Sequence, residues 1–484
     1  MGKLAVAAMP WMKDALKALY TKRVSTKASE RTWTEVTNAV IRHTKVLAER
    51  FCEISTVAFP QETTQIDKIY IPLKLQERNR PNHHEIDAFP SSLLTKVRKL
   101  LVVDAAGMGK STVSRVIFLR ALGEQKALPV FVDLRRLTGD TRIDDVLAAQ
   151  FALKKKHEEQ FFDFLRTQPI LFLFDGFDEI AESEKIHVAR MIRDFVDQNE
   201  KATFFVTSRP EIYFSNFTDF KKYSIKPLAK SEAHELIRKY GAAYEIEDRA
   251  KSLLEELRAK HDPAVSSFLE NPLLTSLLFR AFEYKSVVPV KRGVFYRQVF
   301  DALYDAHDLN KETGFVRTKK TGLHQDDFHR VLRAMASMFR RRKVSEVTQD
   351  IFKEMAREVT ATVCSDLTFA PDDLVHDCTS SVPLFARDGN HIRWSHKSLL
   401  DYFLSEFLTR DYTESKIEAL KKVAFSGQSI ADQNFLTLVH ETDPTLFTEA
   451  VTIPAGAHCL RRYEGRFQGP RATQSVHRSR IGLA

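Results

Sequence analysis

The sequence predicts a three-layer α/β sandwich built on a parallel sheet and followed by mostly helical domains. From residue 99 onward, apolar runs of strand length alternate with amphipathic segments. The runs read KLLVVDA, LPVFVDL, ILFLFDG and ATFFVTS. They are apolar nearly throughout, which is typical of strands buried on both faces of a parallel sheet. Strands that alternate with helices indicate βαβ crossovers, which place helices on both faces of the sheet.

Five regions are expected along the 484 residues: an N-terminal helical segment with a linker, the α/β core, a helical domain, a second mostly helical domain with β-prone pieces, and a short C-terminal region. Their predicted bounds are 1–95, 96–227, 228–310, 311–412 and 413–484. Residues 76–92 are polar and contain two prolines, which indicates a linker. Residues 460–484 are rich in Gly and Arg, which predicts a flexible basic tail.

The composition favours an ordinary intracellular globular protein. The four cysteines, Cys52, Cys364, Cys378 and Cys459, are far apart, so neither a zinc site nor a disulfide framework is expected. No window reaches the ~18 apolar residues of a membrane span. The apolar stretch at residues 4–9 is too short for a signal-peptide core. We therefore expect a cytoplasmic protein without a membrane span.

The residues after the first buried strand carry the most specific motif. Asp-Ala-Ala-Gly-Met-Gly-Lys-Ser-Thr at 104–112 leads directly into an amphipathic helix. Gly107 and Gly109 let backbone N–H groups curl around a phosphate, and the helix N-terminus adds partial positive charge. Lys110 is expected to reach the β- and γ-phosphates, and the Ser111 hydroxyl to bind Mg²⁺. The predicted nucleotide-binding residues of this P-loop are Asp104, Ala105, Ala106, Gly107, Met108, Gly109, Lys110, Ser111 and Thr112.

One position of the loop departs from the usual G-x-x-x-x-G-K-[ST] pattern. Asp104 stands where the pattern has its first glycine. Its carboxylate would bring a negative charge near the phosphates, which predicts weaker nucleotide affinity. Aspartate tolerates unusual backbone dihedrals better than most residues, so the loop itself is still expected to form.

An acidic cluster follows the third buried strand. Residues 170–180 read ILFLFDGFDEI, so a buried strand delivers Asp175 at its carboxyl end. A P-loop fold holds its Mg²⁺ at this place, and Asp175 is predicted to bind the metal through water. Asp178 and Glu179 are predicted to lie near the position where an attacking water is polarised.

The fourth buried strand also ends in polar residues. Thr207, Ser208 and Arg209 close the run ATFFVTS, and Pro210 stops it. A guanidinium at this edge can sense the γ-phosphate of a nucleotide, which is the role predicted for Arg209. The alternative is that Arg209 only pairs with a surface acid.

In combination, the motifs resemble the NACHT module, a branch of the STAND class of signalling P-loop NTPases. The strings D-G-F-D-E at 175–179, T-S-R-P at 207–210 and LPVFVDL at 128–134 match the metal-binding, sensor and second strands of that module. Downstream, NPLL at 271–274 resembles the proline motif of its first helical domain. WSHKSLLDYF at 394–403 resembles its winged-helix signature.

The resemblance implies specific roles and a mechanism. Pro272 would lie against the nucleotide base, and His396 would touch the β-phosphate of bound ADP, with a helix-capping or core histidine as the alternative for His396. ATP or ADP and Mg²⁺ would be the cofactors. An ADP-bound closed form would exchange to an ATP-bound form that self-oligomerises, and slow ATP hydrolysis would reset the switch. The short C-terminal region suits the short bacterial anti-phage relatives, in which the role is innate immune defence.

Two other functions stay open on the sequence. A nucleic-acid-handling AAA-like ATPase would suit the net charge of +9 and the arginines of the tail at 461, 462, 466, 471, 478 and 480. A nucleotide-binding scaffold without hydrolysis would suit the departure at Asp104. The trigger and the effector are unknown.

Overall fold

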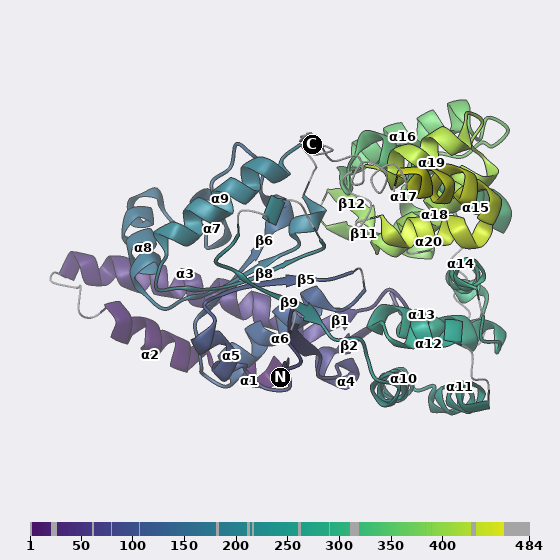
Figure 1. Ribbon diagram of the computed structural model, residues 1–484. Helices are drawn as coiled ribbons and strands as arrows, with labels where there is room; N and C mark the ends of the chain where they lie inside the picture. The colour runs from purple at the N-terminus through teal and green to yellow at the C-terminus, as the bar shows by residue number, and fades with distance from the viewer. Residues whose placement is uncertain are drawn as a thin grey trace, which may run out of the picture.

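Buried apolar strands form a seven-stranded, mostly parallel sheet at the centre of the chain, which confirms the predicted fold class (Figure 1). The computed structural model describes residues 2–20, 27–60, 62–78, 80–105, 107–180, 183–210, 213–214, 217–259, 263–289, 291–309, 319–382, 384–388, 390–426 and 432–458. The five parallel strands of the sheet are β5 (Lys99–Val103), β6 (Pro129–Asp133), β7 (Leu171–Asp175), β8 (Thr203–Ser208) and β9 (Lys221–Ile225).

The order of the strands brings the polar motifs together. Across the sheet the order is β4-β3-β9-β5-β8-β7-β6, so β8 lies between the strand before the phosphate loop and the strand that ends in Asp175. In register, Val103 pairs with Ser208 and Phe174 with Val206. The carboxyl ends of β5, β8 and β7 therefore meet at one edge, where ligands of open α/β sheets bind.

Part of the expected linker belongs to the sheet. Strands β3 (Lys74–Glu77) and β4 (His83–Glu85) pair antiparallel with each other, and β3 also pairs antiparallel with β9. The side chains of β4 are mostly exposed because it is the edge strand, so its sequence lacks an apolar pattern. Just before β3, residues Ile66–Ile69 form the short helix α4.

Helices cover both faces of the sheet. Figure 1 shows the purple N-terminal helices and α6 on one face and α7 to α9 on the other. The helices of this sheet lobe are α1 (Gly2–Ala7), α2 (Met9–Tyr20), α3 (Lys27–Cys52), α5 (Ser91–Lys96), α6 (Lys110–Gly123), α7 (Ile143–Gln150), α8 (Lys155–Thr167) and α9 (Lys185–Gln198). Strands β1 (Glu53–Ser55) and β2 (Thr63–Gln65) form a separate hairpin after α3.

The described residues from Lys230 onward form a second lobe, which begins with helices (Figure 1). They are α10 (Lys230–Ala243), α11 (Glu247–Ala259), α12 (Pro263–Leu269), α13 (Pro272–Lys285) and α14 (Arg292–Leu309). The next elements are α15 (Gln325–Arg342), α16 (Gln349–Thr362), α17 (Pro371–His376) and α18 (Lys397–Arg410). Strands β10 (Glu346–Thr348), β11 (Phe385–Asp388) and β12 (His391–Trp394) form a three-stranded antiparallel sheet among them, called the C-terminal sheet here.

The described part of the chain ends in a small helical unit. Helices α19 (Lys416–Ala424), α20 (Gln433–Thr442) and α21 (Pro444–Phe447) pack together, and α20 also packs on α18. The assignment of residues 311–412 as a winged-helix domain stays a prediction. The predicted basic tail and Cys459 lie outside the described residues. Among the described helices, none is long and apolar enough to cross a membrane.

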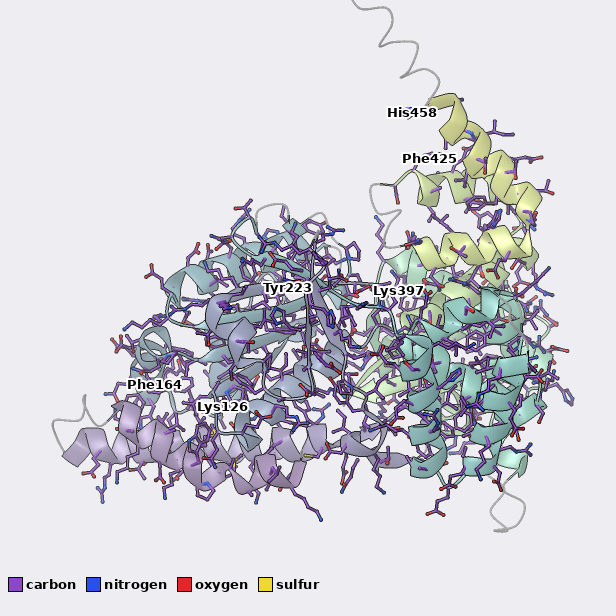
Figure 2. The ribbon with its side chains drawn as sticks, turned by 60° about the horizontal axis from the view of Figure 1, so that its bottom comes forward. Lys126, Phe164, Tyr223, Lys397, Phe425 and His458 are labelled. Carbon is purple, nitrogen blue, oxygen red and sulfur yellow. The ribbon has the colours of Figure 1, made fainter. Side chains whose placement is uncertain are left out.

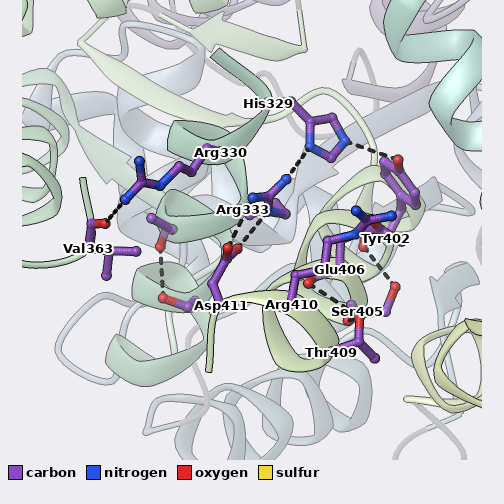
Figure 3. Close-up of polar contacts among 12 residues, drawn as sticks. His329, Arg330, Arg333, Val363, Tyr402, Ser405, Glu406, Thr409, Arg410 and Asp411 are labelled. Carbon is purple, nitrogen blue, oxygen red and sulfur yellow. Dashed lines mark hydrogen bonds and ion pairs between the residues drawn. The ribbon is translucent and has the colours of Figure 1, made fainter. Parts of the chain in front are cut away.

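A buried polar chain fastens α15 to α18 (Figure 3). Arg333 donates from Nη1 to His329 Nδ1 over 2.9 Å and also binds the carboxylate of Asp411. The other ring nitrogen, His329 Nε2, lies 3.0 Å from the hydroxyl of Tyr402. Because Nδ1 accepts from a guanidinium, Nε2 carries the proton and donates to Tyr402. Burial, reinforced by the nearby arginines, lowers the pKa of His329 to about 2, so the ring is neutral.

Candidate nucleotide-binding site

The phosphate loop adopts a conformation that only glycine accommodates at two positions. Gly107 has φ +81° and Gly109 has φ +94°. A Cβ on Gly107 would lie 2.7 Å from Asn271 Oδ1, and one on Gly109 would lie 2.6 Å from Leu73 Cδ1. Both glycines are therefore required by backbone conformation and by close neighbours. The loop ends at the N-terminus of α6, where partial positive charge favours an anion.

Lys110 is half-buried at the start of α6. Its ammonium donates to the backbone carbonyls of Asp104 and Ala105 over 2.8 and 2.7 Å. An ammonium has three N–H donors, so one is left for a phosphate oxygen. Burial lowers the pKa of Lys110, while the nearby carboxylates of Asp178 and Asp175 favour the charged form. The lysine is held by its own loop at the place where a polyphosphate would lie.

The carboxylate of Asp104 is directed at backbone N–H groups. One oxygen accepts from Ala105 N and the other from Ile225 N on β9, each over 2.7 Å. Asp104 does not line the cavity described below. Burial raises the pKa of Asp104, and the two backbone donors oppose that rise. The residue that replaces the first glycine thus ties the phosphate loop to the neighbouring strand.

Replacing Asp104 by glycine is expected to destabilise the fold without improving nucleotide affinity. The substitution removes the acceptors of two backbone N–H groups, which costs about 1–3 kcal/mol when such groups stay buried. Urea unfolding of the Asp104→Gly and Asp104→Asn variants checks this, and the asparagine variant should lose less because it keeps one acceptor oxygen. A glycine variant that is as stable as wild type and binds nucleotide tightly would contradict this role of Asp104.

The acidic strand end supplies a carboxylate suited to a hydrated Mg²⁺. Asp175 Oδ1 accepts from the hydroxyls of Thr207 and Ser114 over 2.5 and 3.2 Å. Its Oδ2 has no hydrogen-bond partner among the described residues. Among all the residues that the structure describes, no group of three or more His, Cys, Asp or Glu side chains is placed so that it could hold a metal ion. Mg²⁺ in nucleotide sites typically needs only one or two carboxylates beside the phosphates, so Asp175 with Ser111 fits the ion.

Asp178 and Arg209 form a pair at the bottom of the site. Arg209 donates from Nε to Asp178 Oδ2 over 2.8 Å, and its backbone N–H donates to Oδ1 over 3.1 Å. Burial opposes ionisation of Asp178, but the Arg209 guanidinium and the Lys110 ammonium hold its pKa below the ordinary value. Arg209 therefore has a buried acid as its partner rather than a surface acid.

Glu179 lies beside this pair and faces several charges. Arg135 Nη1 lies 3.6 Å from Glu179 Oε2. Burial raises the pKa of Glu179; Arg393 and Arg135 favour its ionised form, and Asp178 disfavours it. A carboxylate with a raised pKa in a cavity is the type of group that accepts a proton from water.

His396 caps a helix, which is the alternative considered from the sequence, and it also lies on the wall of the cavity. Its Nδ1 accepts from the backbone N–H of Ser398 over 3.1 Å, so the residue caps α18. The ring also lines the cavity that holds Lys110 and Arg209. Burial and the nearby charges of Arg209 and Lys110 keep the pKa of His396 well below its ordinary value. The neutral ring therefore carries its proton on Nε2, where it can donate to an anion.

A cavity of about 880 Å³ joins these groups between the two lobes. The predicted site residues on its wall are Gly107, Gly109, Lys110, Ser111, Thr112, Asp178, Glu179, Arg209, Pro272 and His396. Asp104, Ala105, Met108 and Asp175 are not on the wall, and Ala106 lies outside the described residues. The cavity is large enough for a nucleotide, since ligand pockets typically measure about 300–1,000 Å³.

The NACHT domain family matches residues 98–244, which run from β5 to the end of α10. Residues 98–244 are a NACHT domain. Members of this family are nucleotide-binding P-loop NTPases, and the strand order and phosphate loop described above agree with that fold. No curated protein sequence matches the chain.

Distant structural similarities accompany the NACHT match. The Walker-type ATPase of Pyrococcus abyssi is 13% identical, over 67% of this chain and 98% of that one, with a TM-score of 0.30. Cdc6p from Pyrobaculum aerophilum is 13% identical over 65% and 92%, with a TM-score of 0.28. A STAND protein with a tetratricopeptide repeat sensor from Pyrococcus horikoshii is 14% identical over 78% and 49%, with a TM-score of 0.31. These scores are too low to support an argument about function.

Several wall residues of the NACHT site had no signal in the sequence. Part of the wall comes from residues that precede the phosphate loop and from α10: residues 54–57, 66, 69–71 and 73, with Leu236 and Tyr240. The second lobe contributes Ser345, Arg393 and Lys397 to the wall. Figure 2 shows Lys397 at the boundary between the two lobes. Lys397 lies within the motif at 394–403, and Arg393 directly precedes that motif.

Proposed function

We propose that this NACHT chain binds ATP and ADP with Mg²⁺ and uses the nucleotide as a conformational switch. The observation that carries the proposal is the shared cavity. His396 of the second lobe lies on the same wall as Lys110 and Arg209 of the NACHT core. A bound polyphosphate would touch both lobes, so its length would affect how firmly the lobes hold together.

Each element of this chemistry has a candidate residue in the chain. Lys110, the loop N–H groups and the α6 N-terminus would bind the phosphates, and Ser111 with Asp175 would hold Mg²⁺, which neutralises phosphate charge when bound. Residues 54–57, 66, 69–71 and 73 with Pro272 would enclose the base. Glu179 would accept the proton of the attacking water, and Arg209 would sense the terminal phosphate.

The switch requires each nucleotide to bind the two forms with different affinity. The Nε2–H of His396 would donate to the β-phosphate of ADP and favour the closed form. ATP would favour an opened form that self-associates, and slow hydrolysis would reset it. The D-G-F-D-E and T-S-R-P strings resemble the immune-type branch, which supports a cytoplasmic role in defence signalling, with the trigger and the effector to be found.

The first test compares nucleotide binding by wild type and Lys110→Ala. A charge-assisted hydrogen bond contributes about 1.5–3 kcal/mol, so the variant should bind ADP and ATP about 10- to 100-fold more weakly. Isothermal titration with each nucleotide measures this. Lys126→Ala is the matched control, because Lys126 is exposed and Figure 2 shows it away from the boundary between the lobes.

Two results would count against the proposal. Equal affinities of wild type and Lys110→Ala would show that the loop is not the nucleotide site. The switch would fail separately if wild type bound both nucleotides but kept one hydrodynamic radius and one protease-cleavage pattern with ADP, with ATP and without either.

A further inference from the structure

The C-terminal sheet reaches across the lobe boundary and binds the acidic loop of the NACHT core. Ser345 Oγ donates to the backbone carbonyl of Glu179 over 2.5 Å. Ser345 directly precedes β10, whose first residue, Glu346, pairs with Arg393 on β12. Ser345 and Arg393 therefore belong to the same end of the C-terminal sheet, and both line the cavity together with Glu179.

The guanidinium of Arg393 faces this end of the cavity. Its charge acts on both Glu179 and His396. Its Nε is buried and has no hydrogen-bond partner among the described residues. A buried donor without a partner costs about 1–3 kcal/mol, so the position is unfavourable unless the charge serves another group in the site. In the strand pairing Arg393 lies opposite Glu346, and its charge also favours the carboxylate form of Glu179, as does that of Arg135.

Glu179 needs help to act as a base in this environment. Burial and the negative charges of Asp178 and Asp175 favour its protonated form, whereas Arg393 and Arg135 favour the carboxylate. A protonated Glu179 could not accept a proton from water. Arg393, a cation that favours the carboxylate, therefore comes from the C-terminal sheet, and so does the Ser345 hydroxyl that binds the backbone of Glu179.

We propose that Ser345 and Arg393 are positioning residues for Glu179, so that ATP hydrolysis requires the C-terminal sheet to be docked on the NACHT core. The inference rests on the proposed hydrolysis. In that step the oxygen of water bonds to the γ-phosphorus, and the bond from phosphorus to the β–γ bridging oxygen breaks. The bridging electron pair leaves with ADP, and Glu179 takes the proton of the water.

This arrangement makes hydrolysis depend on the conformation of the switch. An opened form would carry ATP with Glu179 unsupported and would turn it over slowly. Docking would complete the site, allow one turnover and leave ADP in the closed form, where His396 binds it. The reset would thus be limited by the fraction of molecules that dock while ATP is bound.

The test measures phosphate release by the full chain carrying Ser345→Ala or Arg393→Gln. Misplacing a catalytic group by ~1 Å costs on the order of 10²-fold, so we expect kcat to fall about 10- to 50-fold in each variant. The KM for ATP should stay within about 3-fold, because neither residue belongs to the phosphate loop. Arg393→Lys keeps the charge and should retain more activity than Arg393→Gln. Ser252→Ala and Arg357→Gln, on exposed faces of α11 and α16, are the matched controls and should match wild type.

Each other outcome overturns the inference. An unchanged kcat would remove both residues from the reaction, and a raised kcat would make the docked sheet an inhibitor of Glu179. A raised KM with normal kcat would assign them to nucleotide binding alone. Thermal unfolding of every variant, with Arg393→Lys as the milder change, separates these results from loss of fold. If wild type binds ATP but releases no phosphate, both the proposed hydrolysis and this inference fail. If Glu179→Gln is inactive while Ser345→Ala is as active as wild type, hydrolysis stands and only this inference fails.

Discussion

Replacing Glu179 by glutamine should lower the rate of ATP hydrolysis by about 10²–10⁴-fold, the range that a general base typically contributes. The amide keeps the size of the side chain but cannot accept a proton from water. It also removes the negative charge that faces Arg135 and Arg393. Nucleotide affinity should change little, because the phosphate contacts of Lys110 and the loop N–H groups remain.

Single-turnover phosphate release and nucleotide titration on the same preparations separate the two effects. Glu200→Gln is a suitable control, since Glu200 is an exposed acid after α9 of the same lobe. Equal turnover by wild type and Glu179→Gln, with nucleotide binding intact, would indicate a scaffold that binds nucleotide without hydrolysing it. A strong loss of affinity in Glu179→Gln would instead place this carboxylate in ground-state binding.

The parallel strands and the phosphate loop were predictable because local sequence determines them. A strand buried on both faces of a sheet is apolar nearly throughout, so the apolar run at 171–175 by itself predicts a buried strand. Gly107 and Gly109 have positive φ, which other residues rarely adopt, so the glycines of the motif predict the backbone conformation of the loop. The sequence also predicts that the polar residues at the carboxyl ends of β7 and β8 lie close together, because parallel neighbouring strands end at the same edge of the sheet.

The remaining parts of the site depend on contacts between distant segments. Ser345 meets Glu179 across 166 positions of sequence, and nothing around Ser345 marks it. The carboxylate of Asp104 finds its partner at Ile225, on a strand whose place beside β5 is set by the order of the whole sheet. The edge strand β4 is polar because its side chains face solvent, so its sequence is like that of a linker. These features require knowledge of which elements pack together.

Acidification from pH 7 to pH 4 should lower the free energy of unfolding by about 3 kcal/mol through His329 alone. Burial lowers the pKa of this histidine to about 2 in the folded chain, whereas an unfolded histidine has a pKa of about 6.5. Below pH 6.5 the unfolded state binds a proton that the folded state rejects. The contribution of His329 to the free energy of unfolding is therefore fully present above pH 6.5. Below that pH it falls by about 1.4 kcal/mol per pH unit.

The His329→Gln variant tests this assignment by urea unfolding between pH 4 and pH 7.5. Glutamine can still meet Tyr402 or Arg333 with a hydrogen bond but does not titrate, so the slope of stability against pH should become shallower by about 1.4 kcal/mol per unit. His391→Gln, at an exposed position on β12, should keep the wild-type slope. An unchanged slope in His329→Gln would mean that the folded chain accommodates a protonated His329. That result is hard to reconcile with a ring whose Nδ1 accepts from the guanidinium of Arg333, because protonation there would place two donors against each other in a buried site.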